Sequence, residues 1–372
     1  MKCSSISRKK VSSLARFLAQ FLRLKPPRRF EILLLTLLLT TTALSGAESA
    51  RSYLKKPDNW FRGEEAKHIA ENLLSWQSVL GSWPKNTNTV GVRYTGDPAQ
   101  LHGTFDNSAT TDELRFLART FQALKEPLHE QAFLKGFDHI LKAQYPTGGW
   151  PQYYPPGKGY ARAITFNDNT MVRLMDFLRD VAHSPSYAFV DTARRNTAQE
   201  AFDRGIQCIL KCQIKVNDKL TAWCAQHDEI DFSPRPARTY ELVSLSGAES
   251  VGLVRLLMSL DRPSSDVVQA IEAAVAWFES SRLTGLRMIQ EKDAESPKGY
   301  DKKVVKDPNG PPLWARFYAI ETNKPIFADR DGIAKSNLAD IGYERRNGYG
   351  WLGEWPASLL AHDHPAWKQR LK

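Results

Sequence analysis

The feature that most constrains the fold of this chain is an internal repeat between two helical segments. Residues 77–84 read QSVLGSWP and residues 144–151 read QYPTGGWP, so both fit Q-x-x-x-G-x-W-P with an offset of 67 residues (144 − 77). The Gly and Pro of each copy predict the end of a helix. A weaker third copy lies between residues 213 and 223. Helical units that repeat in this way bury a shared core only against their neighbours.

Apolar residues at helical spacing predict that most of the chain between residues 62 and 283 is helical. The predicted helices cover residues 64–80, 111–124, 129–144, 170–182, 197–213, 248–260 and 264–282. Ser264 or Ser265 could cap the last of them. We therefore expect a mainly α fold, an incomplete α/α toroid of about three helical-hairpin pairs with long loops and a few short β-strands.

The segment from 284 to 356 differs from the helical part, because it is rich in Gly, Pro, Lys and aromatic residues. We expect long loops with one or two short strands, packed on the helical body as an extension that completes its rim. Loops of this length are usually functional. Residues 48–372 are therefore predicted to form a single domain.

The first 47 residues have the pattern of a targeting segment. They hold nine basic residues and one acidic residue, followed by an apolar run from 32 to 44 and then small residues. A membrane span needs about 20 apolar residues, so the pattern predicts a secretory signal peptide cleaved near Ser45 or Ala47. An uncleaved anchor is the alternative. The predicted location is secreted or periplasmic, without membrane attachment after cleavage.

The charge balance depends strongly on this leader. Without its nine basic and one acidic residues, the totals of 51 and 41 fall to 42 and 40, a net charge of +2. The high isoelectric point is thus largely a targeting feature, and nucleic-acid binding is not expected. The remaining cysteines, Cys208, Cys212 and Cys224, have no zinc spacing and could form at most one disulfide.

Two acidic corners precede predicted helices. Residues 104–107 read TFDN and residues 165–169 read TFNDN, with the two Thr residues 61 positions apart (165 − 104). Asp and Asn favour the first position of a helix, so each corner could simply be a cap. Carboxylate and amide oxygens are also the ligands that calcium prefers. The oxygens would come from Asp106, Asn107, Asn167, Asp168 and Asn169, and a toroid would bring the two corners to one rim.

Other polar and aromatic residues also allow two interpretations. Trp83 and Trp150 could staple their turns to the core, while Tyr153 and Tyr154 could stack on a sugar if they are exposed. His227 is expected to form hydrogen bonds in the core. The arginines could form ion pairs or present a fork to a ligand carboxylate. These arginines are Arg235 and Arg238, with Asp228 or Glu241 as ion-pair partners, and Arg316 and Arg330, with Glu321, Asp329 or Asp331.

Five segments, in order, resemble polysaccharide lyase family 10, the pectate lyases. They are GTFDNSATTDELRFLA, GGWPQYYP, ITFNDNTMVRLMDFL, PARTYELVSLSGAES and WARFYAIETNKPIFADRDG. The resemblance spans roughly residues 60–355 and implies a toroid-like fold. It also implies a catalytic domain that cleaves polygalacturonate and pectate oligosaccharides by β-elimination with Ca²⁺. The chain is expected to act as a monomer. The segment GSWPKN and Ala328 depart from the family pattern.

The resemblance also implies roles for individual residues. It makes Asp106, Asn107 and Asp168 calcium ligands, makes Arg238 the Brønsted base with Arg235 as the fallback, and makes Arg316 and Arg330 substrate-binding residues. Nearby calcium and other arginines are expected to disfavour the charged form of the base. Two other functions stay open. One is a glycoside hydrolase that uses Asp106 and Asp168 as acid and base, and the other is a non-catalytic pectin-binding module.

Overall fold

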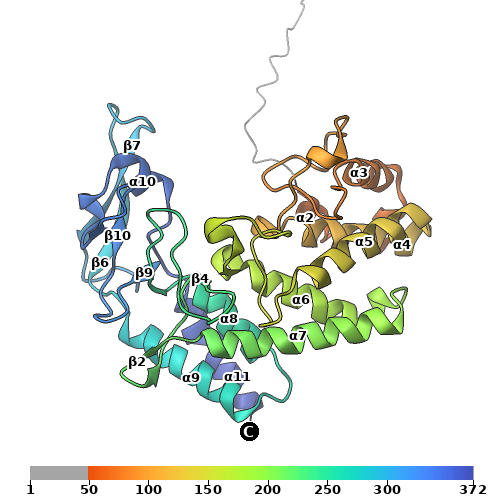
Figure 1. Ribbon diagram of the computed structural model, residues 1–372. Coiled ribbons are helices and arrows are strands. Elements are labelled where there is room, and N and C mark those ends of the chain that lie inside the picture. Colours follow the sequence, from red (N-terminus) through yellow and green to blue (C-terminus); the bar gives the residue numbers. More distant parts are fainter. Residues whose placement is uncertain (1–48, 372) are drawn as a thin grey trace, which may run out of the picture. The chain divides into compact units, whose positions relative to one another are not determined.

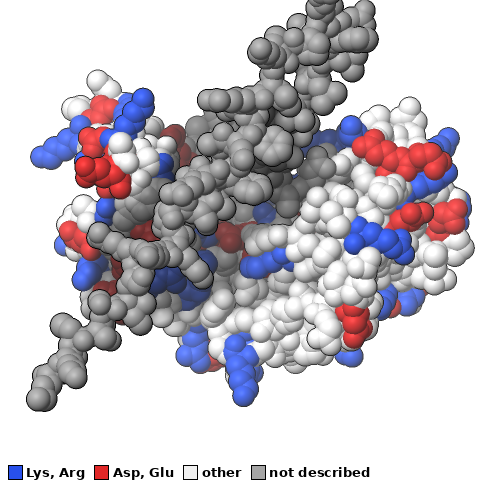
Figure 2. All heavy atoms as spheres, turned by 90° about the horizontal axis from the view of Figure 1, so that it is seen from above, with Lys and Arg blue, Asp and Glu red and all other residues white. Residues whose placement is uncertain are grey.

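The computed structural model describes residues 49–371. The predicted signal peptide and its cleavage site lie outside these residues. Within the described range, no helix is both long enough and apolar enough to cross a bilayer. Lys and Arg side chains alternate with Asp and Glu side chains on the part of the surface that these residues occupy in Figure 2. This agrees with the near-neutral balance calculated without the leader.

Each of the seven predicted helices is present, so the prediction of a mainly α fold is confirmed. They are α3 (Glu64–Ser75), α4 (Thr111–Leu124), α5 (Pro127–Ala143), α6 (Thr170–His183), α7 (Thr192–Cys212), α8 (Glu249–Met258) and α9 (Ser265–Ser280). Helix α4 packs against α5, and α6 packs against α7 (Figure 1). Ser264 is the residue that caps α9, because its side chain accepts a hydrogen bond from the Val267 N–H at 3.4 Å. Shorter helices are α2 (Ala50–Tyr53), α10 (Tyr343–Gly348) and α11 (His364–Arg370).

The repeat corresponds to one arrangement of hydrogen bonds that occurs three times. In each copy the glutamine amide donates to two carbonyl oxygens, one in its own loop and one in the second helix along the chain. The pairs are Gln77 to Gly81 and Ala132, Gln144 to Gly148 and Ala201, and Gln213 to Thr221 and Ala270, at 2.8–3.1 Å. The weak third copy is therefore a true member of the repeat.

The tryptophans of the repeat hold each loop to the helix before it. Trp83, Trp150 and Trp223 are buried, and their indole N–H groups donate to the last turns of α3, α5 and α7 at 2.7, 2.9 and 2.7 Å. Trp314 makes the same bond to the last turn of α9 at 2.7 Å, so it belongs to a fourth copy. The interpretation of Trp83 and Trp150 as staples is confirmed.

The glutamine bonds give a prediction for stability. Gln144→Leu should lower the free energy of unfolding by about 2–4 kcal/mol, because two carbonyl oxygens lose their donor at about 1–3 kcal/mol each with partial relaxation. Urea unfolding would measure this loss. Gln207→Leu, on the exposed face of α7, is the matched control and should change little. Equal effects of the two substitutions would contradict the role assigned to the repeat.

The C-terminal part contains more strand than the sequence predicted. Strands β6 (Leu286–Lys292) and β7 (Tyr300–Lys306) form an antiparallel hairpin over seven residue pairs. Lysines in these segments interrupt the alternation of apolar and polar residues that would predict a strand. The two-residue strands are β1 (Ile164–Thr165), β2 (Lys215–Val216), β3 (Lys219–Leu220), β4 (Gln226–His227), β5 (Leu245–Ser246), β8 (Trp314–Ala315), β9 (Phe317–Tyr318), β10 (Phe327–Ala328), β11 (Ala334–Lys335) and β12 (Leu352–Gly353). They pair as β1–β4, β2–β3, β5–β9, β8–β12 and β10–β11.

Two buried titratable groups make stability depend on pH in opposite directions. His227 is fully buried, with Nε2 accepting from the Cys224 N–H at 3.0 Å and Nδ1 donating to the Phe232 carbonyl at 2.8 Å. Burial lowers its pKa to about 4, so its contribution is present above about pH 6.5 and is lost as the pH falls toward 4. Burial raises the pKa of Glu113 to about 7. The contribution of Glu113 is therefore present below its ordinary value of 4.5 and is lost as the pH rises through 7.

Glu113→Gln isolates one of these two effects. Between pH 4 and pH 8 the native chain should lose about 3 kcal/mol that the variant keeps, because a shift of one pKa unit corresponds to about 1.4 kcal/mol. The His227 contribution is common to both proteins and cancels. Urea unfolding of both proteins at the two pH values checks this. A native-minus-variant difference that is constant with pH would contradict the assignment.

Candidate functional site

The two acidic corners are neighbours in space. They are the short turns η3 (Asp106–Ser108) and η5 (Asn167–Asn169), and these turns contact each other. The third residue after each corner Thr lies in the left-handed region, Asn107 with φ 52° and Asp168 with φ 50°. Asn and Asp tolerate this conformation better than other non-glycine residues. The chain thus builds one turn twice, with the acid and the amide exchanged between the copies.

Neither corner carboxylate caps a helix, so the capping alternative is wrong. The N-terminal residues that flank α4 and α6 are Thr110 and Asn169, and neither makes a side-chain capping bond. Asp106 Oδ1 accepts from the N–H of its neighbour Asn107 at 2.8 Å. The corners therefore have a purpose other than starting helices.

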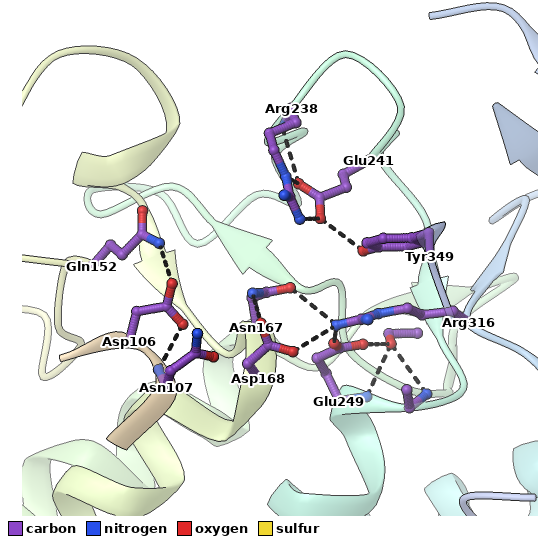
Figure 3. A network of polar contacts seen from close by, with 12 residues as sticks. Asp106, Asn107, Gln152, Asn167, Asp168, Arg238, Glu241, Glu249, Arg316 and Tyr349 are labelled. Carbon is purple, nitrogen blue, oxygen red and sulfur yellow. Dashed lines mark hydrogen bonds and ion pairs between the residues drawn. The ribbon is translucent and has the colours of Figure 1, made fainter. Parts of the chain in front are cut away.

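Asp106 is held by residues from two loops of the repeat. Its side chain is 4% exposed, and its Oδ2 accepts from Gln152 at 2.8 Å and from the Lys85 ammonium. Lys85 and Gln152 each stand two positions after a repeat tryptophan. Figure 3 shows Gln152 and Asn107 on either side of Asp106. The loops that follow Trp83 and Trp150 thus supply the hydrogen-bond partners of Asp106.

Asp168 is more accessible than Asp106 and is held by Arg316, which belongs to the fourth copy of the repeat. Its side chain is 42% exposed, and its Oδ2 accepts from the Asn167 amide at 2.8 Å. Its Oδ1 accepts from Arg316 Nη2 at 3.0 Å, and the same nitrogen donates to Asn167 Oδ1 at 3.2 Å and to Glu249 (Figure 3). Arg316 stands two positions after Trp314, as Lys85 and Gln152 do in their own copies. The carboxylates first considered as its partners, at 321, 329 and 331, are not those it binds.

Glu249 is a site residue that sequence reasoning missed. Backbone N–H groups of Thr104, Thr165 and Ser246 donate to the carbonyls of the first three repeat tryptophans at 2.9, 3.0 and 2.7 Å. Glu249 follows Ser246 by three residues, as Asn107 and Asp168 follow their Thr residues. It is therefore the third member of the corner series. The weak third copy of the repeat was the signal that could have found it.

Asn169, which the sequence analysis added to the possible calcium ligands, does not belong to the site. Its amide oxygen is buried and has no hydrogen-bond partner among the described residues. It lies against Gly252 of α8, where an added Cβ would be 2.0 Å from it. The side chain therefore faces α8 and not the neighbouring corner.

The two candidate base residues differ in their surroundings. Arg238 Nε and Nη2 donate to Glu241 at 2.8 and 2.5 Å, and its guanidinium lies over the rings of Tyr240 and Tyr349, 4.9 and 5.7 Å from their centroids. The Arg316 guanidinium also lies over the Tyr349 ring, 4.9 Å from its centroid. Arg235 instead pairs with Asp228 at 2.9 and 2.6 Å. This geometry favours Arg238 over Arg235, because only Arg238 belongs to the network that reaches Asp168.

The charge state of Arg238 differs from the expectation. The hydrogen bonds to Glu241 raise the pKa of Arg238 more than its partial burial lowers it. The neighbouring Arg345 disfavours the charged form, as expected of an arginine, but the Glu241 carboxylate outweighs it and the net shift of the Arg238 pKa is upward. Burial raises the pKa of Glu241, but the hydrogen bonds from Arg238 and Tyr349 outweigh it and the net shift is downward.

The remaining predicted residues lie around this network. Arg330 is 66% exposed and pairs with Glu344 at 3.1 and 3.2 Å. Arg345, on α10, binds the same Glu344 and lies over Tyr240 at 4.5 Å. The tyrosines after the second Trp loop are half-buried. Tyr153 contacts the His102 ring at 4.5 Å and Tyr154 contacts the His139 ring at 5.8 Å.

The corner residues fit a hard cation in their chemistry. Among the described residues there is no group of three or more His, Cys, Asp and Glu side chains arranged to hold a metal. The corners offer two carboxylates with the amide oxygens of Asn107 and Asn167, and calcium accepts such mixed oxygen ligands. Asn107 is exposed and Asp168 is partly exposed, whereas Asp106 is buried and its Oδ2 binds Lys85 and Gln152. Asp106, Asn107 and Asp168 are the residues that would hold calcium.

Two cavities of the described part lie away from the corners. One of about 720 Å³ lies between the β2–β3 hairpin and α9, and one of about 630 Å³ is lined by β7 and residues 336–339. Neither is lined by Asp106, Asp168 or Arg238. The candidate site is therefore defined by its polar network.

Comparisons with known proteins give the family. Residues 77–360 match the pectic acid lyase family. The chain is also similar to the solved structure of a family 10 polysaccharide lyase from Cellvibrio cellulosa. The identity is 34% over 87% of this chain and 97% of that chain, with a TM-score of 0.73. A mutant of that lyase in complex with trigalacturonic acid matches with the same identity and TM-score, over 85% of this chain and 96% of that chain. The comparison with curated proteins found no match.

The stacked helical hairpins, with a network of carboxylates and arginines between their loops, are those of an α/α-toroid enzyme. The chain belongs to the pectic acid lyase family. It is a pectate lyase, and the resemblance found in its sequence motifs is confirmed.

Proposed function

We propose that this chain is an exported lyase that cleaves polygalacturonate by calcium-assisted β-elimination, with Arg238 as the base. The observation that carries the proposal is the contact between the two corners, which puts the Asp106 and Asp168 turns next to each other. Arg238 joins the same network through Tyr349 and Arg316. The trigalacturonic acid bound by the related lyase supports an oligogalacturonate substrate. Export rests on the predicted signal peptide.

The elimination requires one base and one means of stabilising negative charge. The base takes the proton from C5, and the electrons of that C–H bond form the new C4–C5 double bond. The bond from C4 to the glycosidic oxygen breaks, and the departing oxygen takes a proton from solvent. Negative charge develops on the C5 carboxylate in the transition state. When bound, calcium supplies a Lewis acid for this carboxylate.

The arginines have different proposed tasks. Arg238 is 45% exposed, and the structure records no hydrogen bond from its Nη1 to a described residue, so this nitrogen is available to the substrate. Arg316 is 13% exposed and holds Asp168 and Asn167 in place. Arg330 is the more exposed of the two predicted substrate-binding arginines and can pair with a substrate carboxylate. Fixing the sugar in this way supplies the orientation that the proton transfer needs.

The raised pKa of Arg238 predicts how the rate depends on pH. The base must be neutral, and Glu241 makes the neutral form scarcer than in a free arginine. Below the pKa, the neutral fraction rises about tenfold for each pH unit. The rate should therefore increase with pH well into the alkaline range.

One assay separates the three candidate functions. Absorbance of unsaturated uronate products on polygalacturonate should appear with calcium and disappear with a chelator. A glycoside hydrolase would instead give new reducing ends without absorbance and would be indifferent to the chelator. A binding module would retain pectin without turnover. Either of the last two results would overturn the proposal.

A further inference from the structure

The guanidinium of Arg238 is held on two sides by Glu241 and Tyr349, to which the proposed mechanism assigns no chemical step. Glu241 accepts from its Nε and Nη2, and also from the backbone N–H of Arg238 at 3.1 Å. The Glu241 side chain is 6% exposed. A carboxylate that is buried and bonded at three points fixes both the rotation and the tilt of the guanidinium.

Tyr349 completes this arrangement from a distant segment. Its hydroxyl donates to Glu241 Oε1 at 2.7 Å, across a separation of 108 residues. Its ring lies between two guanidinium groups, those of Arg238 and Arg316. The electron-rich face of an aromatic ring attracts a cation, so the ring favours the placement of both guanidinium groups. Tyr349 therefore contacts Glu241, Arg238 and Arg316 together (Figure 3).

We infer that Glu241 and Tyr349 are positioning residues that fix Arg238 relative to Asp168. The inference rests on the proposed function of Arg238 as the base. The Glu241 carboxylate takes Nε and Nη2, so the remaining nitrogen, Nη1, is directed toward the substrate. Tyr349 sets the spacing between Arg238 and Arg316, and Arg316 in turn holds Asp168 at 3.0 Å. The base and the acidic corner are thereby built on one rigid chain of contacts.

The contacts that position Arg238 also stabilise its cationic form, which opposes its use as a base. The charged groups and tyrosines that face it are Glu241, Tyr240, Tyr349 and Arg345. Of these, Glu241 favours the cation most strongly, while Arg345 disfavours it. Glu241 therefore places the base correctly and at the same time makes its neutral form scarcer. A residue with a purely structural role would affect neither the pH profile nor the placement of Nη1.

Glu241→Gln separates the two effects. Loss of the charge should shift the pH–rate profile toward lower pH by about one unit or more. The glutamine amide has one acceptor oxygen where the carboxylate has two, so it cannot accept from both Nε and Nη2 in the same way. The looser guanidinium should lower the maximal kcat by about 10–100-fold, with KM within about threefold. Tyr349→Leu removes both the stack and the hydroxyl and should lower kcat similarly. Tyr349→Phe keeps the ring and should retain most of the activity.

Two variants serve as matched controls. Asp301→Asn removes a carboxylate that binds Arg346 at two points, at 2.9 and 2.8 Å, in another part of the chain. Tyr343→Phe removes a hydroxyl that bonds the Tyr300 carbonyl at 2.7 Å. Neither should move the pH profile. Circular dichroism and thermal unfolding establish that every variant is folded.

A second measurement does not depend on turnover. Hydrogen exchange of the Arg238 Nε–H, followed by NMR, should be slow in the native protein and faster in Glu241→Gln. Fast exchange in the native protein would overturn the inference. An unchanged pH profile with kcat within about threefold in both Glu241→Gln and Tyr349→Leu would also overturn it. If the native protein forms no unsaturated product, the proposed function fails, and the exchange result still decides whether Glu241 holds Arg238.

Discussion

Arg238→Gln is expected to reduce kcat on polygalacturonate by about 10³-fold or more, with calcium affinity unchanged. Glutamine keeps a polar side chain but cannot take a proton, and removal of a general base typically costs about 10²–10⁴ in rate. The rate of formation of unsaturated product measures this loss. Calorimetric titration with calcium checks that the corners are intact.

Arg235→Gln is the comparison that identifies the base. Arg235 is 53% exposed and pairs with Asp228, apart from the network of Tyr349 and Arg316. We expect its replacement to affect KM more than kcat. If the large loss of kcat instead follows Arg235→Gln, Arg235 is the base and the network around Arg238 has another use.

Asp168→Asn is expected to weaken calcium binding by about 100-fold and to reduce activity in parallel. Calcium affinity depends on the number of charged ligands, and the substitution removes one of the two corner carboxylates while keeping the shape of the side chain. Calorimetry of calcium binding is the primary measurement. High calcium should restore part of the activity if the loss arises from metal binding.

Asp176→Asn provides the control on the same helix. Asp176 pairs with Arg179 three residues along α6 at 2.8 Å, outside the corners. Its replacement should leave calcium affinity unchanged. Equal weakening in both variants would mean that Asp168 acts through the stability of α6 and is no ligand.

The helices could be predicted because each carries its own information. The apolar spacing within a segment determines which face is buried, so all seven helices of the hairpins were found within a few residues of their ends. The repeat motif also indicated that the corners would be neighbours, because equivalent loops of stacked hairpins occupy equivalent positions. The staple role of Trp83 and Trp150 was one of the two interpretations that the sequence left open, and the structure decides for it.

The network around the base could not be predicted, because its contacts join distant segments. Arg316 reaches Asn167 across 149 residues and Tyr349 reaches Glu241 across 108 residues. A single sequence contains no periodicity at such separations. Local ion pairs were easier, since Asp228 and Glu241 were named as partners of Arg235 and Arg238 from their closeness in the chain. The same closeness misled the search for the partner of Arg316.

The hairpin of β6 and β7 could not be predicted from the sequence for a different reason. Its strands are rich in charged residues on both edges of a short apolar stripe, so their pattern resembles that of a loop. The pairing of residues 286–292 with residues 300–306 supplies the backbone hydrogen bonds that stabilise it. This stabilisation arises between strands and leaves little trace in either one alone.

The most direct test is a crystal structure of Arg238→Gln grown with calcium and trigalacturonic acid. The account predicts one calcium ion bound to carboxylate oxygens of both Asp106 and Asp168 at about 2.3–2.6 Å, with a sugar carboxylate completing its ligands. Calcium bound at a single corner, or sugar bound elsewhere on the chain, would contradict it.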